Sequence, residues 1–351
     1  MYGGEAWYIY GGSLQQISSL NTSIINGSTH VQIYGGSVDQ IYGGNRHGTV
    51  KGEGHEYGSK IEVLGGHVKN AGAGPHSGPN GQINKKGWIR VVNAVITDHM
   101  QGGGFDCNNT TTRFPLMDGA KVEVIDSVVQ GPIYGGGDDG WQPQNKPSVK
   151  GDIDISIAGS TVEGNVYGGA KLGPVMSNVS IHITDSTVAG VFGAGAGGSG
   201  VTASVNGSVA ITIDGNSQIG NVYGGANSTG EVGANVDVNI LDAEVANIHG
   251  AGLGSATSVV GTSKITIRDG AHVTGNIYGG GDSGSSKTSS LLIQGGTIDG
   301  SIFGGGNNIG TGSAQVTVSG TPALGGSIYG GGQQQCRNHH NIRDHGQRHF
   351  G

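Results

Sequence analysis

The sequence predicts an all-β fold, a right-handed parallel β-helix (β-solenoid) of about 11 coils with a period of 25–33 residues. Three observations predict it: abundant glycine, a recurring aromatic signature, and runs in which Ile or Val alternates with polar residues. Glycine supplies 74 of 351 residues and proline only 8, without the three-residue period that collagen requires. Regular Val and Ile positions argue against a disordered chain.

The signature is Ile or Val, then a ring, then Gly. From residue 131 onward the rings follow one another at intervals of 25 to 33 residues, as in a solenoid. They are Tyr134, Tyr167, Phe192, Tyr223, His249, Tyr278, Phe303 and Tyr329. Tyr10, Tyr34 and Tyr42 carry the same signature. We expect the rings to stack as an inward aromatic ladder rather than to form a sugar-binding platform.

A second element precedes each signature. Ile153, Ile155 and Ile157 alternate with polar residues, as in a strand with one buried face. Turns such as Asp214-Gly215 follow, where Gly or Asx accepts positive φ. One repeat therefore reads strand, tight turn, short strand ending in the ring, glycine corner and variable loop. Antiparallel hairpins or propeller blades are the alternative, but recurring like positions favour parallel stacking.

One slot two residues before the ring repeatedly holds asparagine. The residues are Asn165, Asn221, Asn247 and Asn276. Stacked amides can hydrogen-bond from coil to coil. We therefore expect a structural asparagine ladder and no ligand site there.

The pattern xVxIxI, a DG-type turn and then GxVYGGG resembles the repeats of large, glycine-rich bacterial cell-surface and adhesin-like proteins, especially from gut anaerobes. The resemblance covers about residues 1–332 and is clearest from 120 onward. It implies a parallel β-helix in a secreted, exposed location, and carries over no functional residue. The stretch 45–119 departs from the pattern, with long loops where signatures are expected.

Composition limits the partners. Net charge is −7 without a basic stripe, which argues against nucleic-acid binding, and no apolar run is long enough for a membrane span. Cys107 and Cys336 form no metal-spaced pair. We expect residues 1–335 to form a single solenoid domain with irregular long loops within 45–147, as part of a longer chain.

The candidate binding residues lie in or near those loops. They are Trp88, Asp98, Asp106, Asp138, Asp139 and Trp141, with His99 beside them. Adjacent coils could gather the carboxylates for glycan cleavage, and a tryptophan could stack on a sugar. Glycan binding without cleavage needs fewer groups, and simple solvation of polar loops is the alternative to both.

No cofactor is expected, although calcium stays open as an alternative. GGGDDG (135–140) and GGGDSG (279–284) resemble the Gly/Asp repeats of calcium β-rolls. Those rolls place Asp in every nine-residue turn, whereas Asp follows the glycine triplet only twice here. We expect no metal site.

Residues 336–351 lack the repeat and contain four histidines. A metal-binding cluster is one interpretation. A frameshift is the other, because reading Asn338-His339-His340-Asn341 one nucleotide forward gives four residues that are each Ile or Thr. That composition suits the next expected strand, so we interpret the tail as frameshifted or disordered.

Together these observations predict an extracellular structural or adhesive segment of a bacterial surface protein, contacting host or cell-wall glycans or surface proteins. The alternative is a β-helical carbohydrate-active enzyme, either a polysaccharide lyase or a glycoside hydrolase.

Overall fold

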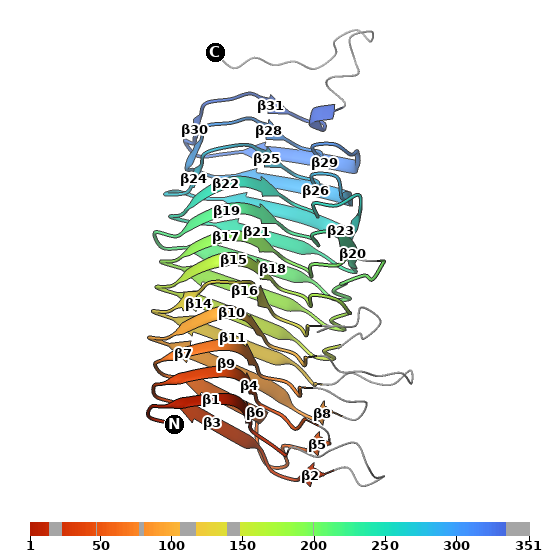
Figure 1. Cartoon of the computed structure of the whole chain (residues 1–351). Coiled ribbons are helices and arrows are strands. Elements are labelled where there is room, and N and C mark those ends of the chain that lie inside the picture. Colours follow the sequence, from red (N-terminus) through yellow and green to blue (C-terminus); the bar gives the residue numbers. More distant parts are fainter. Residues whose placement is uncertain are drawn as a thin grey trace.

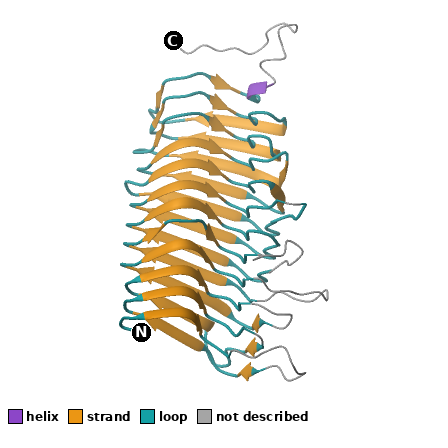
Figure 2. Cartoon of the chain, viewed as in Figure 1, coloured by secondary structure: helices purple, strands orange, loops and turns teal. Residues whose placement is uncertain are grey.

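The computed structural model describes residues 1–13, 23–46, 48–76, 81–105, 117–138, 148–198 and 200–334. Across them the chain winds into one continuous stack of coils, with the N-terminal coil at one end and residues near 330 at the other (Figure 1). Strands and connecting loops make up nearly all of it (Figure 2). The predicted all-β solenoid is confirmed. The tail 336–351 lies outside the described residues.

Each coil contributes to as many as three faces. The first sheet contains β1 (Glu5–Tyr10), β4 (Ser37–Tyr42), β7 (His67–Gly72), β10 (Val95–Gln101), β12 (Val128–Val129), β13 (Ile133–Tyr134), β15 (Thr161–Tyr167), β17 (Thr187–Phe192), β19 (Gln218–Tyr223), β22 (Glu244–His249), β24 (His272–Val273), β25 (Ile277–Tyr278), β27 (Thr297–Ile298), β28 (Ile302–Phe303), β30 (Ala323–Leu324) and β31 (Ile328–Tyr329). The second contains β3 (Thr29–Ile33), β6 (Tyr57–Val63), β9 (Lys86–Val92), β11 (Ala120–Ile125), β14 (Ile153–Ala158), β16 (Val179–Thr184), β18 (Val209–Asp214), β20 (Thr229–Val232), β21 (Val236–Ile240), β23 (Ala256–Ile267), β26 (Ser285–Ile293) and β29 (Thr311–Val318).

The third face was expected to be a variable loop. It begins as a short sheet of β2 (Ile24–Ile25), β5 (Thr49–Val50) and β8 (Gln82–Ile83). Single parallel bridges then continue it from coil to coil, through Ile83, Met117, Val149, Val175, Val205 and Val232. Each of these coils contributes only one buried apolar residue to the third face, and a single residue shows no alternation from which a strand could be predicted.

The strands pair in parallel and in register. Ile155 of β14 lies beside Ile181 of β16, which lies beside Ile211 of β18. Parallel pairing between successive coils excludes the hairpin and propeller alternatives. Within the described residues the second sheet's main path runs through eleven strands, from β3 to β29, and so makes about ten full turns.

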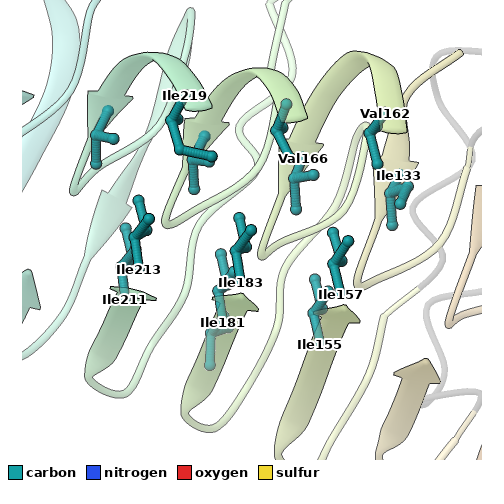
Figure 3. Close-up of a cluster of buried hydrophobic side chains, with 14 of the residues drawn as sticks. Ile133, Ile155, Ile157, Val162, Val166, Ile181, Ile183, Ile211, Ile213 and Ile219 are labelled. Carbon is teal, nitrogen blue, oxygen red and sulfur yellow. The ribbon is translucent and has the colours of Figure 1, made fainter. Parts of the chain in front are cut away.

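Ile and Val side chains from the sheets fill the interior. Ile155 and Ile157 of β14 face Val162 and Val166 of β15, and the same arrangement repeats in the next coils (Figure 3). These side chains are 2% exposed or less. Burial of stacked branched side chains is the main apolar stabilisation of such a narrow fold.

The turn between the two strands uses the left-handed backbone region in successive coils. Gly215 has φ +61° and Gly270 has φ +82°, as the DG pattern predicts. Asp126, Asp185 and Asp242 occupy equivalent turns with φ of 46° to 47°. Gly and Asx residues adopt this conformation at low cost, which explains their recurrence in the turn.

The predicted rings do stack in one column. From Tyr134 to Tyr329 each ring lies on the next, with centroids 4.7 to 5.3 Å apart and planes within 16° of parallel. The expected inward direction is wrong. Val166 points into the Ile/Val core, so Tyr167 beside it points to the outer side of the sheet, in a separate cluster. Ala196 and Leu253, from the loops after the corners, pack against that cluster.

The N-terminal coils also differ from expectation. Tyr10 and Tyr42 share the ring column, but Tyr34 lies at the other end of the sheet and stacks on Tyr2. The repeat does not lapse over 45–119. The register places Gly72 and Gln101 in the ring slot there. The strands of these two coils pair in parallel with their neighbours, but without a ring the signature does not mark the coils in the sequence.

The asparagine ladder is present with a gap. Asn247 donates to Asn221 Oδ1 at 3.0 Å, and the Asn247 side chain accepts from the Asn276 backbone at 2.8 Å. Gly190 pairs with Asn165 in that slot and interrupts the column. Asn165 instead donates to the Tyr167 hydroxyl.

Candidate functional site

Two of the predicted carboxylates meet at one histidine. His99 Nδ1 lies 3.4 Å from Asp98 Oδ1, and His99 Nε2 lies 3.4 Å from Asp138 Oδ2. Asp98 and His99 lie within β10, where its register against β7 shifts, while Asp138 follows the glycine corner of the next coil. The Asp138 backbone nitrogen donates to the Gly104 carbonyl at 3.0 Å, which fixes its place beside β10. The sequence predicted this proximity of Asp98 and Asp138.

A lysine from the following coil completes the charge cluster. Lys171 Nζ lies 2.9 Å from Asp138 Oδ1, whose side chain is only 3% exposed. Phe105, Asp138 and Lys171 hold the same place after three successive glycine corners, and the Lys171 backbone donates to Gly137. A buried carboxylate needs such a partner because desolvating an unpaired charge is costly. Lys171 was not singled out from the sequence, although it follows Gly168-Gly169-Ala170 just as Asp138 follows its glycine triplet.

Polar side chains continue the cluster toward the N-terminal coils. With its amide nitrogen turned toward β10, Asn70 donates to Asp98 Oδ2 at 2.9 Å and to His99 Nδ1 at 3.1 Å. Gln101 is 1% exposed, and neither atom of its amide has a hydrogen-bond partner among the described residues. Asp98 itself is half exposed, so solvent reaches one side of the cluster.

Aromatic rings border the same face. His76 lies edge-on to Tyr42 at 4.4 Å between ring centroids, and Phe105 contacts both of them. Phe105 also lies 6.2 Å from the His99 ring. Sequence reasoning missed His76 and Phe105, which lie just beyond the glycine corners of coils that lack a ring.

Trp88 lies elsewhere. It belongs to β9 of the second sheet, where Lys60 and Lys121 are its neighbours on the flanking strands. Their ammonium groups lie 4.1 and 5.3 Å from the ring centroid, and the indole nitrogen donates to Glu123 at 2.6 Å. The expected grouping of Trp88 with Asp98 is therefore wrong, because the two strands belong to different sheets. Asp106, Asp139 and Trp141 lie outside the described residues.

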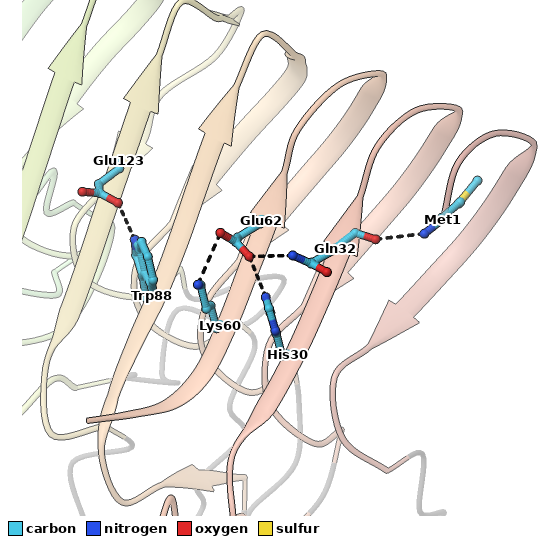
Figure 4. A network of polar contacts seen from close by, with 7 residues as sticks. All are labelled: Met1, His30, Gln32, Lys60, Glu62, Trp88 and Glu123. Atoms are coloured by element: carbon cyan, nitrogen blue, oxygen red, sulfur yellow. Dashed lines mark hydrogen bonds and ion pairs between the residues drawn. The ribbon is translucent and has the colours of Figure 1, made fainter. Parts of the chain in front are cut away.

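The surroundings of Trp88 form a row of polar contacts along the second sheet. Figure 4 draws the row: Met1, His30, Gln32, Lys60, Glu62, Trp88 and Glu123. Burial raises the pKa of Glu62, but hydrogen bonds with His30, Gln32 and Lys60 outweigh it and hold that pKa below its usual value. The row ties neighbouring coils together, with the Glu62 carboxylate held between His30 and Lys60.

The described aspartates of the two glycine-aspartate motifs make contacts within the protein. Asp138 is paired with His99 and Lys171, and Asp282 accepts from the Asn307 side chain at 2.6 Å. Nowhere in the described ranges do three or more His, Cys, Asp or Glu side chains gather as a metal site would require. The described part also contains no helix long and apolar enough to span a membrane.

The fold and this geometry define a parallel β-solenoid with a charged cluster on the outer side of its first sheet. No protein-family model, no curated protein and no solved structure matches the chain.

Proposed function

We propose that this chain is a rigid, extracellular stalk or adhesin segment of a bacterial surface protein, which projects other modules and contacts glycans or surface proteins. The continuous column of coils is the observation that carries the proposal. Across the described residues, strand pairing and the Ile/Val core run from coil to coil as one body, and the ring column is continuous from Tyr134 to Tyr329. A repeat array in which each coil binds only its neighbours suits a spacer of fixed length.

Surface labelling tests the location. An antibody raised against the folded chain should label intact cells of the source bacterium, and brief protease treatment of intact cells should remove the signal. A cytoplasmic protein of known abundance, probed in parallel, controls for lysis. Labelling only after permeabilisation would overturn the proposal, as would a full-length gene that joins this segment to a cytoplasmic domain.

Glycan cleavage is a second candidate, supported by the cluster of Asp98, His99 and Asp138. Two carboxylates beside a histidine offer the acid and base groups that glycoside cleavage needs. A reducing-sugar assay on neutral and acidic polysaccharides separates the two functions. The stalk predicts no new reducing ends. An enzyme predicts turnover that Asp138→Ala abolishes and that Asp237→Ala, at an exposed ion pair on β21, leaves intact.

A further inference from the structure

A second polar surface adjoins the charged cluster, nearer the beginning of the same strands. There the outer face of the first sheet is hollowed into an open groove of about 350 Å³ that crosses β1, β4, β7 and β10. Four strands at a spacing of ~4.8 Å make it about 14 Å across. Its side chains include Glu5, Trp7, Asp39, His67, Lys69 and Thr97.

The groove is local to these coils. The outward position that follows the first inward apolar residue holds Trp7, Asp39, Lys69 and Thr97 in β1, β4, β7 and β10. In β17, β19 and β22 the same position holds Ala189, Gly220 and Ala246. In β15 the same position holds Glu163, so this side chain varies from coil to coil and the repeat by itself does not fix it.

Trp7 is the unusual member of this surface. Its side chain is 80% exposed, whereas the Trp88 ring is covered by Lys60 and Lys121. An exposed indole beside polar groups is a common feature of a ligand surface, since it offers a flat apolar face. Lys69 Nζ lies 3.5 Å from Asp39 Oδ1, so the strands next to Trp7 present both a donor and an acceptor.

We propose that this groove binds a neutral glycan chain, with Trp7 stacking on the C–H face of a sugar ring and Asp39 and Lys69 hydrogen-bonding its hydroxyl groups. A sugar combines an apolar face with a rim of donors and acceptors, and the groove offers the complement of each. Glu5 and Asp39 against Lys69 give two negative charges and one positive charge. That balance disfavours anionic polysaccharides. This inference rests on the proposed function, in which the chain contacts glycans. It adds that the contact lies in this groove and that the glycan is neutral.

Fluorescence titration tests the groove. The full chain is titrated with neutral hexasaccharides of β-linked glucose, xylose and galactose, and with polygalacturonate as the acidic probe. The chain contains three tryptophans, so Trp88→Phe and Trp141→Phe leave Trp7 as the only indole reporter. We expect saturable binding of at least one neutral probe with a change in Trp7 emission, and no binding of polygalacturonate.

Two variants locate the binding. Trp7→Ala should lower the affinity for the neutral probe by about tenfold or more, as loss of a central aromatic contact does. Asp39→Asn should weaken it less, and Trp88→Phe should leave it unchanged, with circular dichroism confirming the fold of each variant. The groove is refuted if Trp7→Ala and Asp39→Asn bind normally, if no neutral probe binds, or if Trp7→Ala disperses a self-associated form instead. Surface labelling is independent of these results, so failure of the groove and failure of the stalk remain distinguishable.

Discussion

The imidazole of His249 stacks on the phenol ring of Tyr223, with centroids 4.7 Å apart and planes 14° from parallel. Tyr278 covers its other face at the same distance. Burial in this column lowers the pKa of His249 to about 4, despite the nearby Asp282 carboxylate and a hydrogen bond with the Gly281 backbone, which act in the opposite direction. A neutral imidazole therefore serves as a ring of the column.

His249 should make stability depend on pH. The unfolded imidazole gains a proton near pH 6.5 and the folded one only near pH 4, so its contribution is complete above pH 6.5 and is lost as pH falls toward 4. This difference corresponds to on the order of 3 kcal/mol. His249→Phe should keep the stack and lose less stability than the wild type between pH 7.5 and 4.5. Urea unfolding at both pH values measures it.

His272 provides the control for this pH effect. It is exposed, and the Asp299 and Glu244 carboxylates raise its pKa. Its contribution is therefore present below pH 6.5 and is lost as pH rises, so His272→Gln should act in the opposite direction. An unchanged pH dependence in His249→Phe would mean that the buried imidazole does not control it.

The first glycine of the signature should be indispensable within the stack. A methyl group at Gly168 would overlap the carbonyl oxygen of Gly193 in the next coil and the side chain of Val179. Gly168→Ala should therefore destabilise the chain by about 2 kcal/mol or more, since a packed core resists overfilling. Gly330 occupies the same slot, and no atom of the described residues lies within 4 Å of the position that its methyl group would take, so Gly330→Ala should have little effect. Equal thermal midpoints for the two variants would contradict this account.

A row of serines supports the turns. Ser160 Oγ accepts from the Ser127 backbone at 3.1 Å and donates to the Ala158 carbonyl at 2.8 Å, and Ser186 repeats this one coil later. Ser160→Ala removes the acceptor of a buried N–H and should cost about 1–3 kcal/mol. Ser180 is exposed on β16, and Ser180→Ala should be neutral. Denaturant midpoints measure both, and a neutral Ser160→Ala would show that the row is dispensable.

The ion pair at Asp138 should matter more than a surface pair. Lys171→Met removes a cation 2.9 Å from a carboxylate that is 3% exposed, leaving that charge with less compensation. We expect a loss of about 1–3 kcal/mol in unfolding free energy. Lys264→Met breaks an exposed pair with Asp237 at 3.7 Å and should cost less than about 0.5 kcal/mol. A larger effect at Lys264 would overturn this ranking.

The coils that lack a ring show the limit of sequence reasoning. Gly72 and Gln101 occupy the ring slot, but neither carries the aromatic signature, so the stretch 45–119 looked like loops. Their strands could still be found in principle, because Ile61 with Val63, and Ile89 with Val91, alternate as in later coils. Trp88 looked like a loop residue for the same reason, and it lies on β9.

The sequence alone determined the order of strands, turns and glycine corners within each repeat. Alternation at Ile153, Ile155 and Ile157 fixed strand and buried face, and the glycine after each ring fixed a corner, because these are local properties of side-chain period and backbone freedom. Tertiary structure decided what covers the rings and which distant residues meet. Tyr167 is buried on the outer side of the sheet because loops from later coils pack against its cluster, and His99, Asp138 and Lys171 meet because coil stacking sets their separation. Those contacts depend on the register between coils, which no single repeat encodes.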